Sequence, residues 1–304
     1  MNIKIFTELV KEELEKIMEC HLEIKCTVKN NGVVLTGIEF KDSDINIAPI
    51  VYMERYYEAF QNGSSMSELI HRLYEEYKNY RVTESINLHY LIDFENVKDR
   101  ISYILVNHDM NKDMLEEYPH TDFLDLAKLY VINISDLKEG TATIKVSHAF
   151  LCLWNKSIEE IDMLATENTE RLFPVQSDRL DMIVKAMMLQ GLGEDNISEE
   201  MQSWLLSADD SMLYVVTNHL MVNGAGVMCY HNVLKNLADR LNSDLYILPS
   251  SLHQILVTTT EGISKYELQD MVFTVNRSKD ITKELILSDN VYLYSREKDC
   301  IEIA

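Results

Sequence analysis

Hydrophobic side chains recur at every third or fourth position in several stretches of the chain, and this spacing predicts amphipathic helices. The stretches cover residues 4–20, 50–60, 66–77, 158–168, 180–188, 233–241 and 265–275. Ser65 with Glu68, and Ser264 with Glu267, have the spacing of a capping box, in which each side chain bonds the other residue's backbone N–H. We therefore expect helices to begin directly after Ser65 and after Ser264.

Other apolar runs are short, and they predict strands. They lie within residues 21–40, 101–107, 129–134, 140–146, 212–218, 244–260 and 291–295. Asn31-Gly32 divides the first of them and predicts a tight hairpin turn. Between residues 107 and 129 we expect a helix or turn around 113–126. Helices and hairpin-like strands mix without regular β-α-β alternation, so the pattern predicts an α+β fold.

The 304 residues suffice for two or three packed subdomains. The pattern predicts an N-terminal α-β-β-α-α unit over residues 1–95, a mixed unit over 96–192 and a C-terminal β-β-α-β-α unit over 193–304. The last boundary is placed at the sequence GLGEDNISEE, residues 191–200, which has the composition of a loop.

Charge restricts the partners that we expect. Fifty acidic residues against 28 basic ones give a net charge of −22, and this field repels nucleic-acid phosphates and anionic lipids. The five cysteines form no CxxC pair, which favours free thiols in a reducing compartment. The start of the chain lacks the pattern of a signal peptide, and no apolar run has the length of a membrane span. We therefore expect a cytoplasmic protein that binds neither membranes nor nucleic acids directly.

The sequence Asn223-Gly-Ala-Gly is the stretch most similar to a cofactor motif. A dinucleotide-binding turn needs a third glycine, but that position is Cys229, and no acidic residue ends the following strand. Asn223-Gly224 between apolar stretches instead predicts a type I′ turn. We expect no cofactor.

A serine and a histidine follow in the sequence LPSSLHQ, residues 248–254. Ser251 and His253 share a face of an extended strand and are the candidate catalytic pair, although the orienting acid and oxyanion hole of a hydrolase are missing. One helix separates NGAG from LPSSLHQ, so we expect the two segments to pack together as a β-β-α-β unit. Ser251 and His253 would then share one surface with the candidate ligand-binding residues Asn218, Asn223, Gly224 and Ser250. This group is interpreted either as a ligand site or as a structural hydrogen-bond network.

Metal-binding motifs such as HxxxH and HExxH do not occur, so no metal is expected. The nearest set of ligand types is His108, Asp109 and Asp113, which lie at the end of a predicted strand. Polar residues at a strand end produce the same pattern without a metal.

Three blocks of sequence together resemble a bacterial family known as domain of unknown function 5688. They are NHDMNKDMLEEYPHTDFLDLAKLY (107–130), TENTERLFP (166–174) and YVVTNHLMVNGAGVMCYHNVLKNLADRLNSDLYILPSSLHQ (214–254). The earlier stretches NNGVVLTGIEF and IAPIVYMERYYEAFQNG extend the likeness over most of the chain. The resemblance implies a bacterial, intracellular protein and assigns no activity, substrate or partner.

Three functions follow from these features. The first is a non-catalytic binding protein whose partner is more naturally another protein than a small ligand, because the chain is acidic and rich in Tyr and Met. The second is a hydrolase centred on Ser251 and His253. The third is an acidic protein that imitates nucleic acid.

Overall fold

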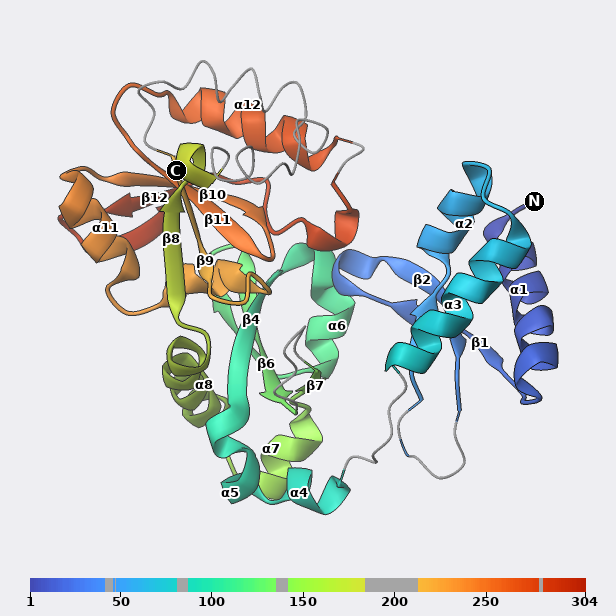
Figure 1. Ribbon diagram of the computed structural model, residues 1–304. Helices are drawn as coiled ribbons and strands as arrows, with labels where there is room; N and C mark the ends of the chain where they lie inside the picture. The colour runs from blue at the N-terminus through green and yellow to red at the C-terminus, as the bar shows by residue number, and fades with distance from the viewer. Residues whose placement is uncertain (42–45, 47, 81–86, 135–141, 184–212, 279–280) are drawn as a thin grey trace. The chain divides into compact units, whose positions relative to one another are not determined.

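The computed structural model describes residues 1–41, 46, 48–80, 87–134, 142–183, 213–278 and 281–304. These residues form two compact units, Met1–Leu91 and Ile92–Ala304 (Figure 1). The sequence boundary at 192/193, and the predicted helix 180–188 from residue 184 onward, lie outside the described residues. Among the described residues, no helix combines the length and the apolar character that a membrane span requires.

Unit 1 packs three helices on a small antiparallel sheet of order β1-β2-β3. Its elements are α1 (Ile3–Met18), β1 (Glu23–Val28), β2 (Val34–Glu39), β3 (Ile50–Tyr52), α2 (Glu54–Gln61) and α3 (Met66–Tyr80). The core side chains Phe6, Ile38, Tyr56 and Leu73 are almost fully buried. Unit 1 is therefore built around one hydrophobic cluster of its own.

The hairpin turn predicted at Asn31-Gly32 is confirmed. Both residues have positive φ, 58° and 66°, as a type I′ turn requires. The helix expected over 50–60 is wrong at its start, because Ile50–Tyr52 pairs with β2 as strand β3 and the helix begins at Glu54. Pairing to a sheet edge decided this stretch, and helical spacing alone does not reveal it.

The first half of unit 2 holds a four-stranded antiparallel sheet. Its strands are β4 (Ile101–Asn107), β5 (His120–Phe123), β6 (Leu126–Asn133) and β7 (Thr143–Lys145). Strand β6 pairs with β4 along one edge, while β5 and β7 share its other edge. The helices are α4 (Leu88–Ile92), which spans the unit boundary, α5 (Phe94–Val97), α6 (Lys112–Glu117), α7 (His148–Trp154) and α8 (Ile158–Leu172). Helix α8 packs along β4 (Figure 1).

The second half forms a six-stranded antiparallel sheet of order β13-β12-β10-β11-β9-β8. The strands are β8 (Val175–Arg179), β9 (Tyr214–Asn218), β10 (Leu245–Ser251), β11 (Gln254–Thr259), β12 (Tyr292–Ser295) and β13 (Cys300–Ile303). Helix α11 (Val233–Leu241) follows the 3-10 helix η5 (Gly224–Cys229). Helix α12 (Lys265–Asn276) lies across one face of the sheet (Figure 1), with Leu268 and Val272 packed on Leu248.

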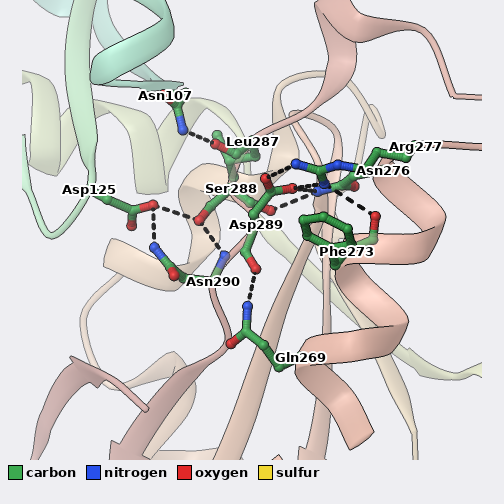
Figure 2. A network of polar contacts seen from close by, with 10 residues as sticks. All are labelled: Asn107, Asp125, Gln269, Phe273, Asn276, Arg277, Leu287, Ser288, Asp289 and Asn290. Atoms are coloured by element: carbon green, nitrogen blue, oxygen red, sulfur yellow. Dashed lines mark hydrogen bonds and ion pairs between the residues drawn. The ribbon is translucent and has the colours of Figure 1, made fainter. Parts of the chain in front are cut away.

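Buried polar contacts join the two sheets of unit 2. The Asp125 carboxylate, in the β5–β6 turn, accepts hydrogen bonds from Ser288 Oγ (2.6 Å) and Asn290 Nδ2 (3.0 Å), as Figure 2 shows. It also accepts one from Tyr292 Oη at 2.6 Å. Tyr103 Oη on β4 donates to the Gly226 carbonyl at 2.9 Å. The three antiparallel sheets with helices on their faces confirm the predicted α+β class.

Candidate functional site

The polar residues singled out between Asn218 and His253 are brought together by strand pairing. Strand β9 ends at Asn218 and pairs with β11, with Val216 opposite Ile255. The β10–β11 hairpin turn, which holds His253, therefore lies beside the segment that leaves β9. The two segments that the sequence joins in one block do meet in space.

The Asn223-Gly224 stretch differs from the type I′ turn that its sequence predicts. Asn223 is left-handed at φ 50°, but Gly224 is not among the described glycines with positive φ, and the 3-10 helix η5 starts there instead of a strand. Glycine is required for a different reason. A Cβ on Gly224 would lie 2.1 Å from Thr217 Oγ1 and 2.4 Å from the His253 carbonyl oxygen. The backbone of η5 is thus pressed against β9 and the β10–β11 turn.

Ser251 and His253 contact each other through the main chain. Ser251 Oγ accepts a hydrogen bond from the His253 backbone N–H at 3.1 Å. The imidazole Nδ1 accepts one from the Asn223 backbone N–H, also at 3.1 Å, so a proton on Nε2 is the consistent neutral tautomer. Burial lowers the pKa of His253. The basic ring nitrogen is thus engaged by a backbone amide.

The neighbouring polar groups also satisfy the backbone. Asn218 Nδ2 donates to the Val222 carbonyl at 2.8 Å, and its Oδ1 accepts from Leu220 N–H at 3.0 Å. Thr217 Oγ1 donates to the His253 carbonyl at 2.6 Å. Ser250 belongs to β10, but its side chain lies outside what the structure describes. These contacts are those of a network that ties turns together.

A shallow cleft lies beside this network. Its cavity has room for little more than a water molecule, about 20 Å³, and the residues around it include Ser102, Tyr103, Asn133, Thr169, Asn218 and Asn223. Several of these groups already bond inside the protein: Asn133 Nδ2 donates to Ser102 Oγ (2.8 Å), and Thr169 Oγ1 accepts from Tyr103 N–H (3.1 Å). Asn133, Ser102, Thr169 and Asn218 are thus already engaged within the protein.

A second cluster forms around His108. Its Nδ1 is 3.5 Å from Asp109 Oδ1, and its Nε2 is 3.6 Å from Asp122 Oδ1. His120 Nε2 lies 3.8 Å from the same oxygen of Asp122. Asp113 is exposed in the first turn of α6 and is not part of this group. Of the set suggested by the sequence, His108 and Asp109 are neighbours, whereas the structure groups His108 with His120 and Asp122 rather than with Asp113.

The family model for the family of unknown function DUF5688 matches residues 3–296. The chain belongs to this family. No curated protein and no solved structure matches the chain. The matched range of the DUF5688 family covers nearly all of both units and every candidate site residue discussed above.

Sequence reasoning missed His120 and Asp122 in this DUF5688 protein because it did not recognise strand β5. The stretch HTDF is short and mostly polar, so it lacks the apolar run by which a strand is found. Its alternation was a usable signal: His120 and Asp122 are two residues apart and would share a face of any strand. Their approach to His108 depends on β5 and β4 both pairing with β6.

Proposed function

We propose that this member of the DUF5688 family is a binding protein that recognises another protein through the outward face of helix α12. The proposal rests on Tyr266 and Phe273, whose exposed fractions are 72% and 50%. They are seven residues apart and so lie on one side of the helix, while Leu268 and Val272 are buried on the other. Large exposed aromatic side chains are typical of the centres of protein interfaces.

Arg277 supports this proposal because it is held in place on the same face. Its guanidinium carbon lies 3.4 Å from the centre of the Phe273 ring, and its NH1 and NH2 groups bond the two Asp289 carboxylate oxygens at 3.1 and 2.9 Å (Figure 2). The Asp289 carboxylate also accepts from Asn276 Nδ2 at 2.9 Å. Because the side chains of Phe273 and Arg277 are already ordered by these contacts, they lose little conformational entropy when a partner covers them.

The chemistry of the partner follows from charge. Exposed Glu267 and Asp270 lie near the two aromatic residues on α12, where Lys265 and Arg277 stack on the rings of Tyr266 and Phe273. The whole chain carries a net charge of −22, so its field favours a basic partner. A partner surface with an apolar pocket surrounded by Lys and Arg is complementary to this face. The third function, an acidic imitation of nucleic acid, remains a prediction.

The contacts of Ser251 and His253 favour binding over hydrolysis, because the basic ring nitrogen of His253 is engaged by the Asn223 amide. We also propose a cytoplasmic location. All five cysteines are free, and Cys26, Cys152 and Cys300 among them are exposed. Exposed free thiols persist in a reducing compartment.

Site-specific photo-crosslinking tests the proposal. A benzoylphenylalanine placed at position 266 should crosslink, in cells of the source organism, to one protein with a basic surface. The same residue at exposed Leu153 on α7 serves as the matched control and should not capture that protein. With the purified partner, a Tyr266→Asp/Phe273→Asp variant should bind at least about tenfold more weakly, whereas Leu153→Asp should bind as the wild type does.

Three results would overturn the proposal. Equal crosslinking from positions 266 and 153 would show that α12 is not a specific surface. Crosslinks only to a second copy of this chain would make the face a self-association surface. An unchanged affinity in the double variant would place the interface elsewhere.

A further inference from the structure

Three side chains that are common metal ligands lie close together at the four-stranded sheet of unit 2, two on strand β5 and one directly after strand β4. Val106 on β4, Ala127 on β6 and Asp122 on β5 form one row across the sheet, so their side chains point to the same face. His120 is two residues before Asp122 on β5 and shares its face. His108 directly follows β4, where the backbone turns helical, and its Nε2 lies 3.6 Å from Asp122 Oδ1. The pairing of β4 and β5 with β6 therefore brings His108 close to His120 and Asp122, although His108 and Asp122 are 14 positions apart in the sequence.

We infer that His108, His120 and Asp122 bind a divalent transition-metal ion of the zinc type. Neither this family match nor the protein-binding proposal assigns this site, and the inference is independent of both. Each residue offers one ligand atom, and the three atoms lie within 4.8 Å of one another. Two imidazole nitrogens and one carboxylate oxygen are ligands that zinc binds in proteins.

The two histidines are oriented for this task through their other ring nitrogens. His120 Nδ1 lies 3.0 Å from the Tyr118 carbonyl oxygen, which can only accept, so Nδ1 carries a proton. In the neutral ring, Nε2 is then the nitrogen whose lone pair can bind a metal. His108 Nδ1 lies 3.5 Å from Asp109 Oδ1, and its Nε2 faces Asp122. A carbonyl or carboxylate behind each imidazole is the usual outer shell of a metal-binding histidine.

The distances are close to those that a metal requires. Bonds of about 2.0–2.2 Å at tetrahedral angles place ligand atoms about 3.4 Å apart. The separations from Asp122 Oδ1 to His108 Nε2 and His120 Nε2 are 3.6 and 3.8 Å. The side chain of Asp122 is 70% exposed, so a fourth position is open to water or an added ligand. Small side-chain rotations complete the site.

The backbone behind the cluster is held firmly. His108 N–H donates to the Asp125 carbonyl at 3.0 Å, which joins the end of β4 to the β5–β6 turn. Asn107 Nδ2 donates to the Leu287 carbonyl at 2.9 Å, and the Asp125 carboxylate is bonded by Ser288 and Asn290, as Figure 2 shows. The ligands from β4 and β5 are therefore positioned by contacts outside the cluster itself, as a preformed site requires.

The competing explanation is a set of surface ion pairs between protonated histidines and Asp122. Such pairs contribute little at this exposure. Ion pairs of this kind need no added cation, whereas three convergent ligand atoms bind Zn²⁺ saturably.

Titration calorimetry of the full chain, stripped of metals by a chelator, tests the inference with Zn²⁺ as the probe. One ion should bind per chain, with micromolar or tighter affinity. Co²⁺ should produce the visible absorption bands of a low-symmetry site. His120→Ala should weaken Zn²⁺ binding at least about a hundredfold, and Asp122→Asn at least about tenfold. His71→Ala, which removes an exposed imidazole from α3, is the matched control and should bind as the wild type does.

If His120→Ala fails to fold, Asp122→Asn still measures the contribution of a ligand to Zn²⁺ binding. Its fold should be unaffected, because Asp122 is largely exposed and the substitution is isosteric. Circular dichroism of each variant checks the fold. The inference is overturned if Zn²⁺ shows no saturable binding, or if binding survives both substitutions, since the ion would then lie elsewhere. If His120→Ala loses Zn²⁺ binding but Asp122→Asn binds Zn²⁺ with unchanged affinity, Asp122 is not a ligand and the proposed set of three ligands is wrong.

Discussion

Thr217 and His253 are joined by a 2.6 Å hydrogen bond from the threonine hydroxyl to the histidine carbonyl, directly beneath Gly224. This contact holds the end of strand β9 against the β10–β11 turn. The start of η5 packs directly on this contact, so there is no room for a side chain at position 224. Gly224, the first glycine of the pair that resembles a phosphate-binding loop, is therefore explained by close packing of one backbone on another.

Replacing Gly224 with Ala should destabilise unit 2 by about 3 kcal/mol, at the upper end of the range for overpacked sites. The new Cβ would meet Thr217 Oγ1 at 2.1 Å and backbone atoms of His253 and Asn218 at 2.4 and 2.9 Å. Backbone atoms of a paired sheet cannot move aside cheaply. Urea unfolding followed by circular dichroism measures the loss.

Gly226→Ala is the matched control within the same 3-10 helix. Its Cβ would approach only the Tyr103 ring, at 3.2 Å, and the ring can shift by a few tenths of an ångström. We expect a loss of about 1 kcal/mol or less. Equal losses in the two variants would contradict the close-packing explanation of Gly224.

Asp125→Ala should destabilise unit 2 by about 3 kcal/mol or more, because three donors lose a charged acceptor. The donors are Ser288, Asn290 and Tyr292, and Ser288 and Tyr292 are fully buried. Thermal or urea unfolding provides the measurement. Asp270→Ala, at an exposed position of α12, should change stability by no more than about 0.5 kcal/mol. A small effect at Asp125 would show that its network does not hold the two sheets together.

His253 should make the protein less stable in mild acid. Burial lowers its pKa in the folded state below the 6.5 of an ordinary histidine, so the unfolded chain takes up a proton at a higher pH than the folded chain does. Stability from this group is present above about pH 6.5 and is lost as the pH falls through the folded-state pKa. Protonation of Nδ1 also removes the acceptor of the Asn223 amide.

The His253→Asn variant tests this pH dependence, because its Oδ1 can still accept from Asn223 but does not titrate. Urea midpoints measured between about pH 7.5 and 5.5 should fall less in this variant than in the wild type. His71→Asn, at an exposed position of α3, should show the same pH dependence of stability as the wild type. An identical fall in wild type and His253→Asn would assign the acid sensitivity to other groups.

Local pattern was sufficient for much of the architecture. The capping boxes at Ser264 and at Ser65 mark helix starts that the structure contains, and Asn31-Gly32 forms its turn. These features depend on residues within about four positions of one another, so the local sequence is sufficient to predict them. Strands β5 and β8 were missed because their residues are mostly polar, and pairing with β6 and β9 supplies their stability.

The candidate sites divide in the same way. The sequence alone determined that the chain is acidic, that it lacks a complete dinucleotide or hydrolase motif, and that its elements form an α+β protein of the DUF5688 family. Tertiary structure alone decided that Gly224 serves close packing, that the Ser251–His253 contact runs through the main chain, and that His108 meets His120 and Asp122. The physical reason for Gly224 and His108 is range: their contacts join segments that are distant in the sequence, and strand register is set by the whole sheet rather than by neighbouring residues. The Ser251–His253 contact is local, but it depends on the turn that the pairing of β10 with β11 forms.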